Sequence, residues 1–111
     1  MENNKDHITT KKDLEKQIIA VLKTIFDPEI PVDIYELGLI YEIKVSDDFD
    51  VEVVMTLTSP SCPVAESMPS EVEQKVAGIW NVKSAKITLV WEPVWTKDMM
   101  SEEAMLELGF L

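Results

Sequence analysis

The feature that most constrains the fold is a pair of alternating segments, residues 39–45 and 51–57, joined by a short polar stretch at 46–50. In each segment apolar side chains occupy every second position, which is the pattern of a β-strand with one buried face. The joining stretch, SDDFD, is rich in turn-forming residues. Two strands joined by so short a turn form an antiparallel hairpin. The side chains expected on one face are Leu39, Tyr41, Ile43 and Val45, followed in the second strand by Val51, Val53, Met55 and Leu57.

A helix is expected before the hairpin. Thr10 can cap its first turn, and Asp13 suits the positive end of the helix dipole. Pro28 disfavours the α conformation in the residue before it, so the helix is expected to end at Asp27. Its apolar face, at helical spacing, consists of Leu14, Ile18, Val21, Leu22 and Ile25.

A second helix is expected from the SPSCP segment at 59–63 to about Gly78. Pro69 either kinks this helix or marks its first turn. The side chains expected to face the core are Val64, Met68, Val72 and Val76.

The remaining chain predicts a third strand at 82–91, with Ala85, Ile87, Leu89 and Trp91 on one face, and a last helix from Ser101 to Gly109. The element order is therefore α-β-β-α-β-α. The β-α-β part makes the second and third strands parallel, whereas the hairpin is antiparallel, so the sheet is mixed. We expect a single α/β (α+β) domain at 10–111, a three-stranded mixed sheet with helices packed on it, after a mobile tail at 1–9.

The charge and the absence of certain patterns exclude several classes of function. Asp and Glu number 21 against 10 Lys and Arg, a formal net charge of −11, so the chain repels phosphate backbones and no nucleic-acid binding is expected. No apolar run reaches the roughly 18–20 residues of a membrane span. The N-terminus lacks a secretory signal, and a single cysteine forms no internal disulfide. We expect a cytoplasmic protein without membrane contacts, biased towards basic partner surfaces.

The single cysteine, Cys62, is the main candidate for chemistry. It lies where a strand is expected to give way to a helix, and the unpaired amides and dipole of a helix start favour a thiolate, which is both a nucleophile and a metal ligand. Thr58, Ser59 and Ser61 supply hydroxyl groups beside it. The alternative is a small buried apolar residue, as most free cysteines are. Position alone does not decide between the two.

Cys62 cannot hold an iron–sulphur cluster by itself, because such clusters take about four ligands. The sequence has no CxxC pair, and its one histidine, His7, lies in the expected tail, so a Cys–His catalytic pair is unsupported. Any metal or cluster bound through Cys62 would share ligands with a second copy, a partner protein or a small thiol. A homodimer would bring two cysteines together, although no residue requires it.

Two further groups have alternative interpretations. The acidic residues Asp27, Glu29, Asp33 and Glu36 are either hard-metal ligands or a solvated turn. Trp91 and Trp95 either pack the last helix onto the sheet or form an aromatic patch that binds a partner.

Four separated blocks, in order, resemble the SufT/PaaD-like family, which includes the MIP-type proteins of eukaryotic cytosolic iron–sulphur assembly. The blocks are DPEIPV at 27–32 with LGLIY at 37–41, MTLTSPSCP at 55–63, VWEPVW at 90–95, and MMSEEA at 99–104 with LGF at 108–110. The resemblance covers residues 11–111. PaaD itself carries further C-terminal cysteines that this chain lacks, which weighs against a role in phenylacetate degradation.

The resemblance implies a fold like the cluster-assembly domain of NifU-like proteins and a role in maturing iron–sulphur proteins. The family's recurring polar positions fall here on Asp27, Glu29, Thr58, Ser59 and Cys62. The resemblance also includes Gly38 and Leu39, which come before the first strand. Cys62 would be the metal ligand. Asp27 and Glu29 are expected to organise their loop, because a bare carboxylate beside the thiol would raise its pKa.

Three hypotheses follow for function, none of them enzymatic. The first is a SUF-associated maturation factor that binds iron or a transient cluster through Cys62 and passes it from scaffold or carrier proteins to target apoproteins. The second is a non-catalytic adaptor that recruits targets through its acidic surface and Trp91 and Trp95, with Cys62 structural. The third is a thiol-redox protein, which the lack of a resolving cysteine disfavours.

Overall fold

The hairpin predicted from the alternating segments is present. In the computed structural model, which describes residues 10–27, 30–58 and 64–109, β1 (Ile40–Val45) pairs antiparallel with β2 (Asp50–Met55). The turn is fixed by Ser46, whose Oγ accepts hydrogen bonds from the amides of Asp48 and Asp50 at 3.2 and 3.0 Å. The residue between these two, Phe49, has φ 67°, a left-handed conformation that tightens the turn.

The alternation predicted for the first strand is interrupted at one residue. The register shifts between Ile40 and Glu42, so that Ile40 lies opposite Met55 and Glu42 opposite Val54, leaving Tyr41 at a β-bulge. Ile43 and Val45 keep the predicted face, opposite Val53 and Val51. The expectation that Tyr41 shares this face is wrong, because the bulge changes the parity of the strand.

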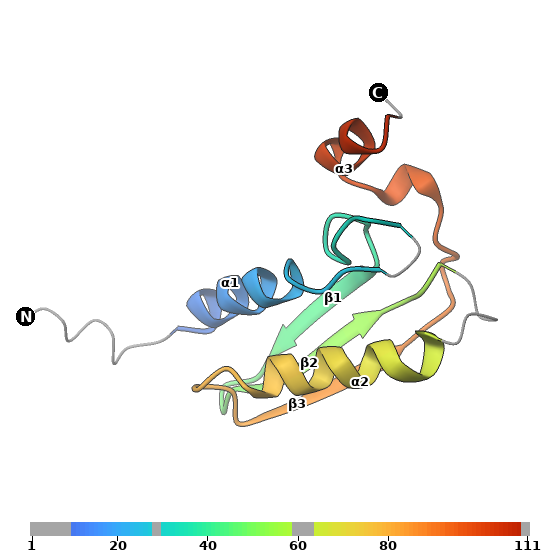
Figure 1. The fold of residues 1–111 in the computed structure, drawn as a ribbon. Helices are drawn as coiled ribbons and strands as arrows, with labels where there is room; N and C mark the ends of the chain where they lie inside the picture. The colour runs from blue at the N-terminus through green and yellow to red at the C-terminus, as the bar shows by residue number, and fades with distance from the viewer. Residues whose placement is uncertain (1–9, 28–29, 59–63, 110–111) are drawn as a thin grey trace, which may run out of the picture.

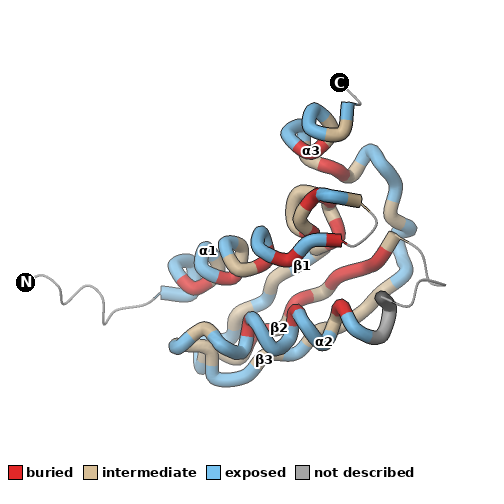
Figure 2. The backbone as a smooth tube through the Cα atoms, viewed as in Figure 1, coloured by how far each residue is buried: buried red, intermediate tan, exposed pale blue. Residues whose placement is uncertain are grey.

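The third strand, β3 (Ser84–Leu89), pairs parallel with β2, and the three-stranded sheet of the described chain has the order β1-β2-β3. The sheet is therefore mixed, as predicted. Figure 1 shows α1 (Lys11–Leu22) and α2 (Val64–Ala77) lying along the sheet. Buried positions follow β2 and the inner sides of both helices (Figure 2). Val51, Val53 and Met55 are almost fully buried in this core.

Helix α1 begins as predicted and ends earlier than predicted. Thr10 Oγ1 accepts from the Asp13 amide at 3.0 Å, and the Asp13 carboxylate accepts from the Thr10 amide, a reciprocal cap. The helix ends at Leu22, not at Asp27. Thr24 donates to the Val21 carbonyl through both its amide and its hydroxyl, at 2.9 and 2.6 Å, and closes a turn there. β-Branched residues such as Thr24 favour helix less, and the backbone beyond it is extended.

Helix α2 settles the position of Pro69. The helix begins at Val64, so Pro69 lies inside it and does not mark its first turn. Of the side chains predicted to face the core, those of Met68, Val72 and Val76 are buried. The side chain of Val64 lies outside the described residues, as does the whole tail at 1–9.

The chain after β3 runs over the segment that precedes β1. It contains a short 3₁₀ helix, η2 (Lys97–Met99), and α3 (Glu102–Glu107), which Ser101 caps through its Oγ as predicted. The Ser101 amide donates to the Glu36 carbonyl at 2.8 Å, which ties the two segments together. Their approach is so close that a Cβ on Gly38, at φ +85°, would lie 2.2 Å from the Met99 carbonyl oxygen. No helix in the described ranges is long and apolar enough to cross a membrane.

Candidate functional site

The end of β2 leads directly into the segment that carries the cysteine. The described chain reaches Thr58 and resumes at Val64, the first residue of α2, so Cys62 precedes the helix by two positions but lies outside the described residues, as do Ser59 and Glu29. Figure 1 shows the end of β2, the start of α2 and the chain leaving β3 at one end of the molecule.

Hydrogen bonds fix the last residues of β2 on both sides. The Thr56 amide donates to the Leu39 carbonyl at 2.9 Å, and the Val90 amide donates to the Met55 carbonyl at 2.8 Å. Leu39 is fully buried, and its own amide donates to the Ile34 carbonyl at 3.2 Å. The structure thus brings the predicted pair Gly38 and Leu39 beside the strand end that leads to the half-buried Thr58.

Asp27 is buried, with 7% of its surface exposed, and it shapes its own loop. Its Oδ1 accepts a hydrogen bond from the Ile30 amide at 3.0 Å, and its amide donates to the Val32 carbonyl at 3.3 Å. Hydrogen-bonded carboxylates of this kind stabilise tight turns. Asp27 thus contacts the backbone of its own loop through both its side chain and its amide, and its role at a functional site stays a prediction.

The other acidic residues of this region also make turn contacts. The Asp33 carboxylate accepts hydrogen bonds from the amides of Tyr35 and Glu36, both at 3.0 Å, and Glu36 lies 3.4 Å from the Lys23 ammonium. Within the described ranges, no three His, Cys, Asp or Glu side chains are placed so that they could hold a metal ion together. The contacts of Asp33 and Glu36 are those of a turn.

The two candidate tryptophans have different surroundings. The Trp95 indole N–H donates to the Leu37 carbonyl at 2.8 Å, and its ring packs against the core. Trp91 is 38% exposed, and the nearby Val94 is 67% exposed. Trp95 therefore joins the chain after β3 to the body of the fold, whereas Trp91 and Val94 present apolar surface to solvent.

A shallow apolar groove of about 510 Å³ lies in the same part of the molecule, lined by Gly38, Ile40, Tyr41, Pro93 and Met99. The Tyr41 hydroxyl donates to the Pro93 carbonyl at 2.7 Å across this groove. The phenol is protonated at neutral pH at its ordinary pKa of 10.0, and burial raises the pKa of Tyr41 further, so the hydroxyl remains a donor. Sequence reasoning missed this contact, because it depends on the bulge that turns Tyr41 away from the predicted face.

Thr56 is a second residue that the sequence did not single out. It is 1% exposed, and its buried Oγ1 has no hydrogen-bond partner among the residues that the structure describes. An unpaired buried hydroxyl costs about 1–3 kcal/mol, so such groups are uncommon unless they serve a purpose. The available signal was its place in the run MTLTS, two residues before Thr58, where a polar side chain interrupts a buried strand.

Comparison with known proteins shows which family this chain matches. Residues 15–89 match the model of the family described as "Iron-sulfur cluster assembly protein". A Porphyromonas gingivalis protein named "Fe-S protein maturation auxiliary factor" is 56% identical over 87% of this chain and 92% of its own length. The Staphylococcus aureus factor SufT, of the same description, is 41% identical over 77% of this chain and 97% of its own.

A solved structure supports the same assignment. The crystal structure of a DUF59 domain from Bacillus anthracis superimposes with a TM-score of 0.83 at 33% identity, covering 90% of this chain and 95% of the other. The shared fold therefore extends over most of both chains. This chain belongs to the iron-sulfur cluster assembly protein family.

Proposed function

We propose that this protein is an auxiliary factor in the maturation of iron–sulphur proteins in the cytoplasm, and that it binds iron or a cluster transiently through Cys62. The observation that carries the proposal is the 56% identity, over nearly the whole of both chains, to a protein named as such a factor. Its partners would be scaffold or carrier proteins on one side and target apoproteins on the other.

The neighbourhood of Cys62 suits this role. α2 begins two residues after it, and a thiol close to a helix start has a lowered pKa, because unpaired amides stabilise the thiolate. The hydroxyls of Thr58 and Ser59 would donate hydrogen bonds to a sulphur ligand, and Asp27, Glu29, Gly38 and Leu39 would hold the surrounding loops. Met68, Val72 and Val76 anchor α2 in the core, and so fix one end of the cysteine segment.

A single protein thiolate suits transfer better than storage. The Cys62 sulphur would donate an electron pair to iron and displace one ligand of the donor, and a thiolate of the target apoprotein would later displace Cys62 in the same way. The oxidation states of iron and sulphur stay the same in both steps. The remaining ligands, of about four that a cluster requires, would come from the partner or a second copy.

Anaerobic reconstitution with ferrous iron and sulphide, followed by absorption spectroscopy, tests the proposal. Wild-type protein should take up iron, and Cys62→Ser should not. A matched control moves the thiol: in Cys62→Ser/Ser70→Cys the sulphur lies on the exposed side of α2. If this double variant takes up as much iron as wild type, or if wild type takes up none, binding at Cys62 is wrong.

A second candidate, the non-catalytic adaptor, is favoured by the exposed apolar side chains of Trp91 and Val94 beside the groove at Tyr41. Here target proteins would dock on this surface, and Cys62 would be structural. Trp95 is expected to contribute as well, but replacing it also removes the hydrogen bond to Leu37 and disturbs the fold.

Maturation of a target enzyme in cells separates the two candidates. The adaptor predicts that Cys62→Ala leaves maturation intact and that Trp91→Ala/Val94→Ser reduces it. Trp80→Ala is the matched control, because Trp80 is 78% exposed on the turn between α2 and β3. Loss of maturation in Cys62→Ala alone would contradict the adaptor, and equal losses in the Trp91 and Trp80 variants would remove the role of this surface.

A further inference from the structure

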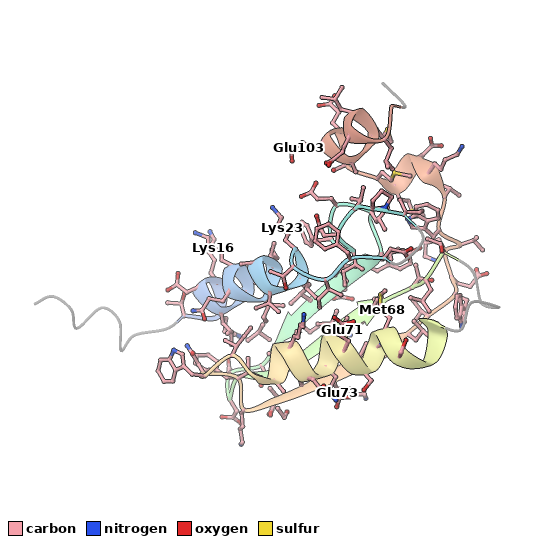
Figure 3. All side chains as sticks on the ribbon, in the orientation of Figure 1. Lys16, Lys23, Met68, Glu71, Glu73 and Glu103 are labelled. Carbon is pink, nitrogen blue, oxygen red and sulfur yellow. The ribbon has the colours of Figure 1, made fainter. Side chains whose placement is uncertain are left out.

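A second groove, of about 420 Å³, lies between the end of α1, residues 31–36 and α3. Asp33 and Glu36, described above for their turn contacts, line it, whereas Asp27, Gly38, Leu39 and Thr58 do not. Its lining combines one exposed aromatic ring, Phe26, with the charged side chains of Lys23, Asp33, Glu36, Glu103 and Glu107. Figure 3 shows Lys23, near the end of α1, and Glu103, on α3, on the same side of the molecule.

The backbone holds Phe26 outward. Phe26 pairs with Asp33 in an antiparallel bridge, and its neighbours Ile25 and Asp27 are buried. In extended backbone, successive side chains point to opposite sides, so burial of both neighbours turns Phe26 towards solvent. It is 57% exposed. A large ring fixed in the open at the edge of a groove is a natural anchor for an apolar side chain of a partner.

The charged side chains around Phe26 are four carboxylates and one ammonium. Lys23, the one cation of the lining, pairs with Glu36 and lies 5.5 Å from the centre of the Tyr35 ring. Glu103 and Glu107 are four residues apart on α3, and no cation of the described chain forms a salt bridge with either. Like charges at this spacing destabilise a helix, and a cation bound in the groove would relieve their repulsion.

Other occupants fit this groove less well. The described carboxylates include no group of three that could chelate a metal ion. Because this chain has a net charge of −11, it would repel a phosphate or a second copy of itself. The complementary occupant is a segment with Lys or Arg on both sides of an aliphatic side chain.

We propose that this groove docks a short basic and apolar segment of a partner protein, with its aliphatic side chain on Phe26 and its cations at Glu103 and Glu107. The proposal goes beyond the function proposed above, since it uses neither Cys62 nor the surface at Trp91. A factor with a docking groove apart from its cysteine segment can hold a partner while the cysteine remains accessible.

Titration of isotope-labelled protein with synthetic peptides, followed by NMR amide shifts, tests the proposal. The probe is acetyl-GSRLKRSG-amide, with GSRSKRSG and GSQLQQSG as matched peptides that lack the leucine and the cations respectively. The probe should shift the amides of Phe26, Glu103 and Glu107, and both matched peptides should bind about tenfold more weakly, which corresponds to about 1.4 kcal/mol.

Variants assign the binding to the groove. Phe26→Ala and Glu103→Gln/Glu107→Gln should each weaken the probe about tenfold. Phe26→Leu, which keeps an apolar side chain, should retain binding and shows that a loss in Phe26→Ala is not a folding defect. Glu73→Gln, on the exposed side of α2 (Figure 3), and Cys62→Ser should change nothing.

Four results would overturn the proposal. Equal binding of GSRSKRSG would show attraction by charge alone, and equal effects of Glu73→Gln and Glu103→Gln/Glu107→Gln would show that the probe has no defined site. The same amide shifts with Mg²⁺ alone would make the groove a cation site. A concentration-dependent increase in sedimentation that Phe26→Ala abolishes would assign it to a second copy.

Discussion

Gly38 is the residue at which the fold tolerates least change. Its φ of +85° costs a side chain about 1–2 kcal/mol, and a Cβ would also lie 2.2 Å from the Met99 carbonyl oxygen. Gly38→Ala should therefore destabilise by more than about 2 kcal/mol, since it strains the backbone and displaces the chain after β3. Gly109→Ala is the matched control, because Gly109 has φ +84° and no atom within 4 Å of the added Cβ. Urea unfolding measures both variants, and equal costs would show that the contact with Met99 is unimportant.

At Thr56, in contrast, a substitution should stabilise the fold. Because its buried Oγ1 has no hydrogen-bond partner in the described part of the chain, replacing the hydroxyl with a methyl group removes a desolvation cost. Thr56→Val should raise the free energy of unfolding by about 1 kcal/mol, measured from the urea midpoint at constant slope. A decrease of similar size would mean that the hydroxyl is hydrogen-bonded in solution. If the variant is more stable yet matures targets poorly, Thr56 belongs to the functional site.

At the scale of elements, the apolar patterns were a better guide to which helices and strands form than to the residues at which they end. The hairpin, the parallel third strand and the caps at Thr10 and Ser101 were all predicted, because each depends on local chemistry or on a two-residue period. The early end of α1 was not, because the backbone beyond Thr24 enters a bridge with residues that follow the loop. Such long-range pairing has no local signal.

The candidate site was predictable to the same extent. The sequence placed Asp27, Gly38, Leu39 and Thr58 near one another through a resemblance, and the structure joins their segments by backbone hydrogen bonds. The sequence alone could not show that Trp91 and Trp95 differ in exposure, because the packing of Trp95 depends on the Leu37 carbonyl, which is far away in the sequence. It also missed Tyr41, because the alternation of β1 gives no sign of the bulge.

The sheet face opposite the helices carries an ionic cluster with a predictable response to acid. Thr88 donates a hydrogen bond to the Glu52 carboxylate, and this bond, with Lys44 and Lys86 nearby, lowers the pKa of Glu52 below its ordinary value of 4.5. A lowered pKa in the folded state stabilises the protein above about pH 4.5, and the contribution is lost as pH falls through the folded value.

Thr88→Val should therefore raise the pKa of Glu52 towards 4.5, as followed by NMR titration of its side-chain carboxyl. It should lower stability at neutral pH and have little effect in acid, where Glu52 is protonated in both proteins. Thr88→Ser keeps the hydroxyl and should titrate like wild type. An unchanged pKa in Thr88→Val would show that the two lysines, and not the hydroxyl, set the titration.

At the scale of the whole molecule, the dominant feature is the excess of negative charge. A net charge of −11 is confined in a fold whose Cα radius of gyration is 15.0 Å. The Debye length is about 30 Å at 0.01 M salt and about 8 Å at 0.15 M. At low salt the excess carboxylates therefore repel one another across the whole fold, and at physiological salt only close neighbours do. Folding brings these charges together, and the repulsion opposes it.

Stability should consequently rise with salt. Between about 0.01 and 0.15 M NaCl we expect a gain of roughly 1 kcal/mol, or about 4–8 °C in Tm for a domain of this size. A variant with Glu73→Lys and Glu42→Lys, two exposed positions outside the first turn of any described helix, should begin with a higher Tm at low salt and gain less, because its net charge is smaller. Screening also weakens close pairs such as Lys11–Asp47, at 2.7 Å, which opposes the trend. A Tm that falls with salt would mean that these pairs outweigh the long-range repulsion. The excess of negative charge would then cost the free protein little stability.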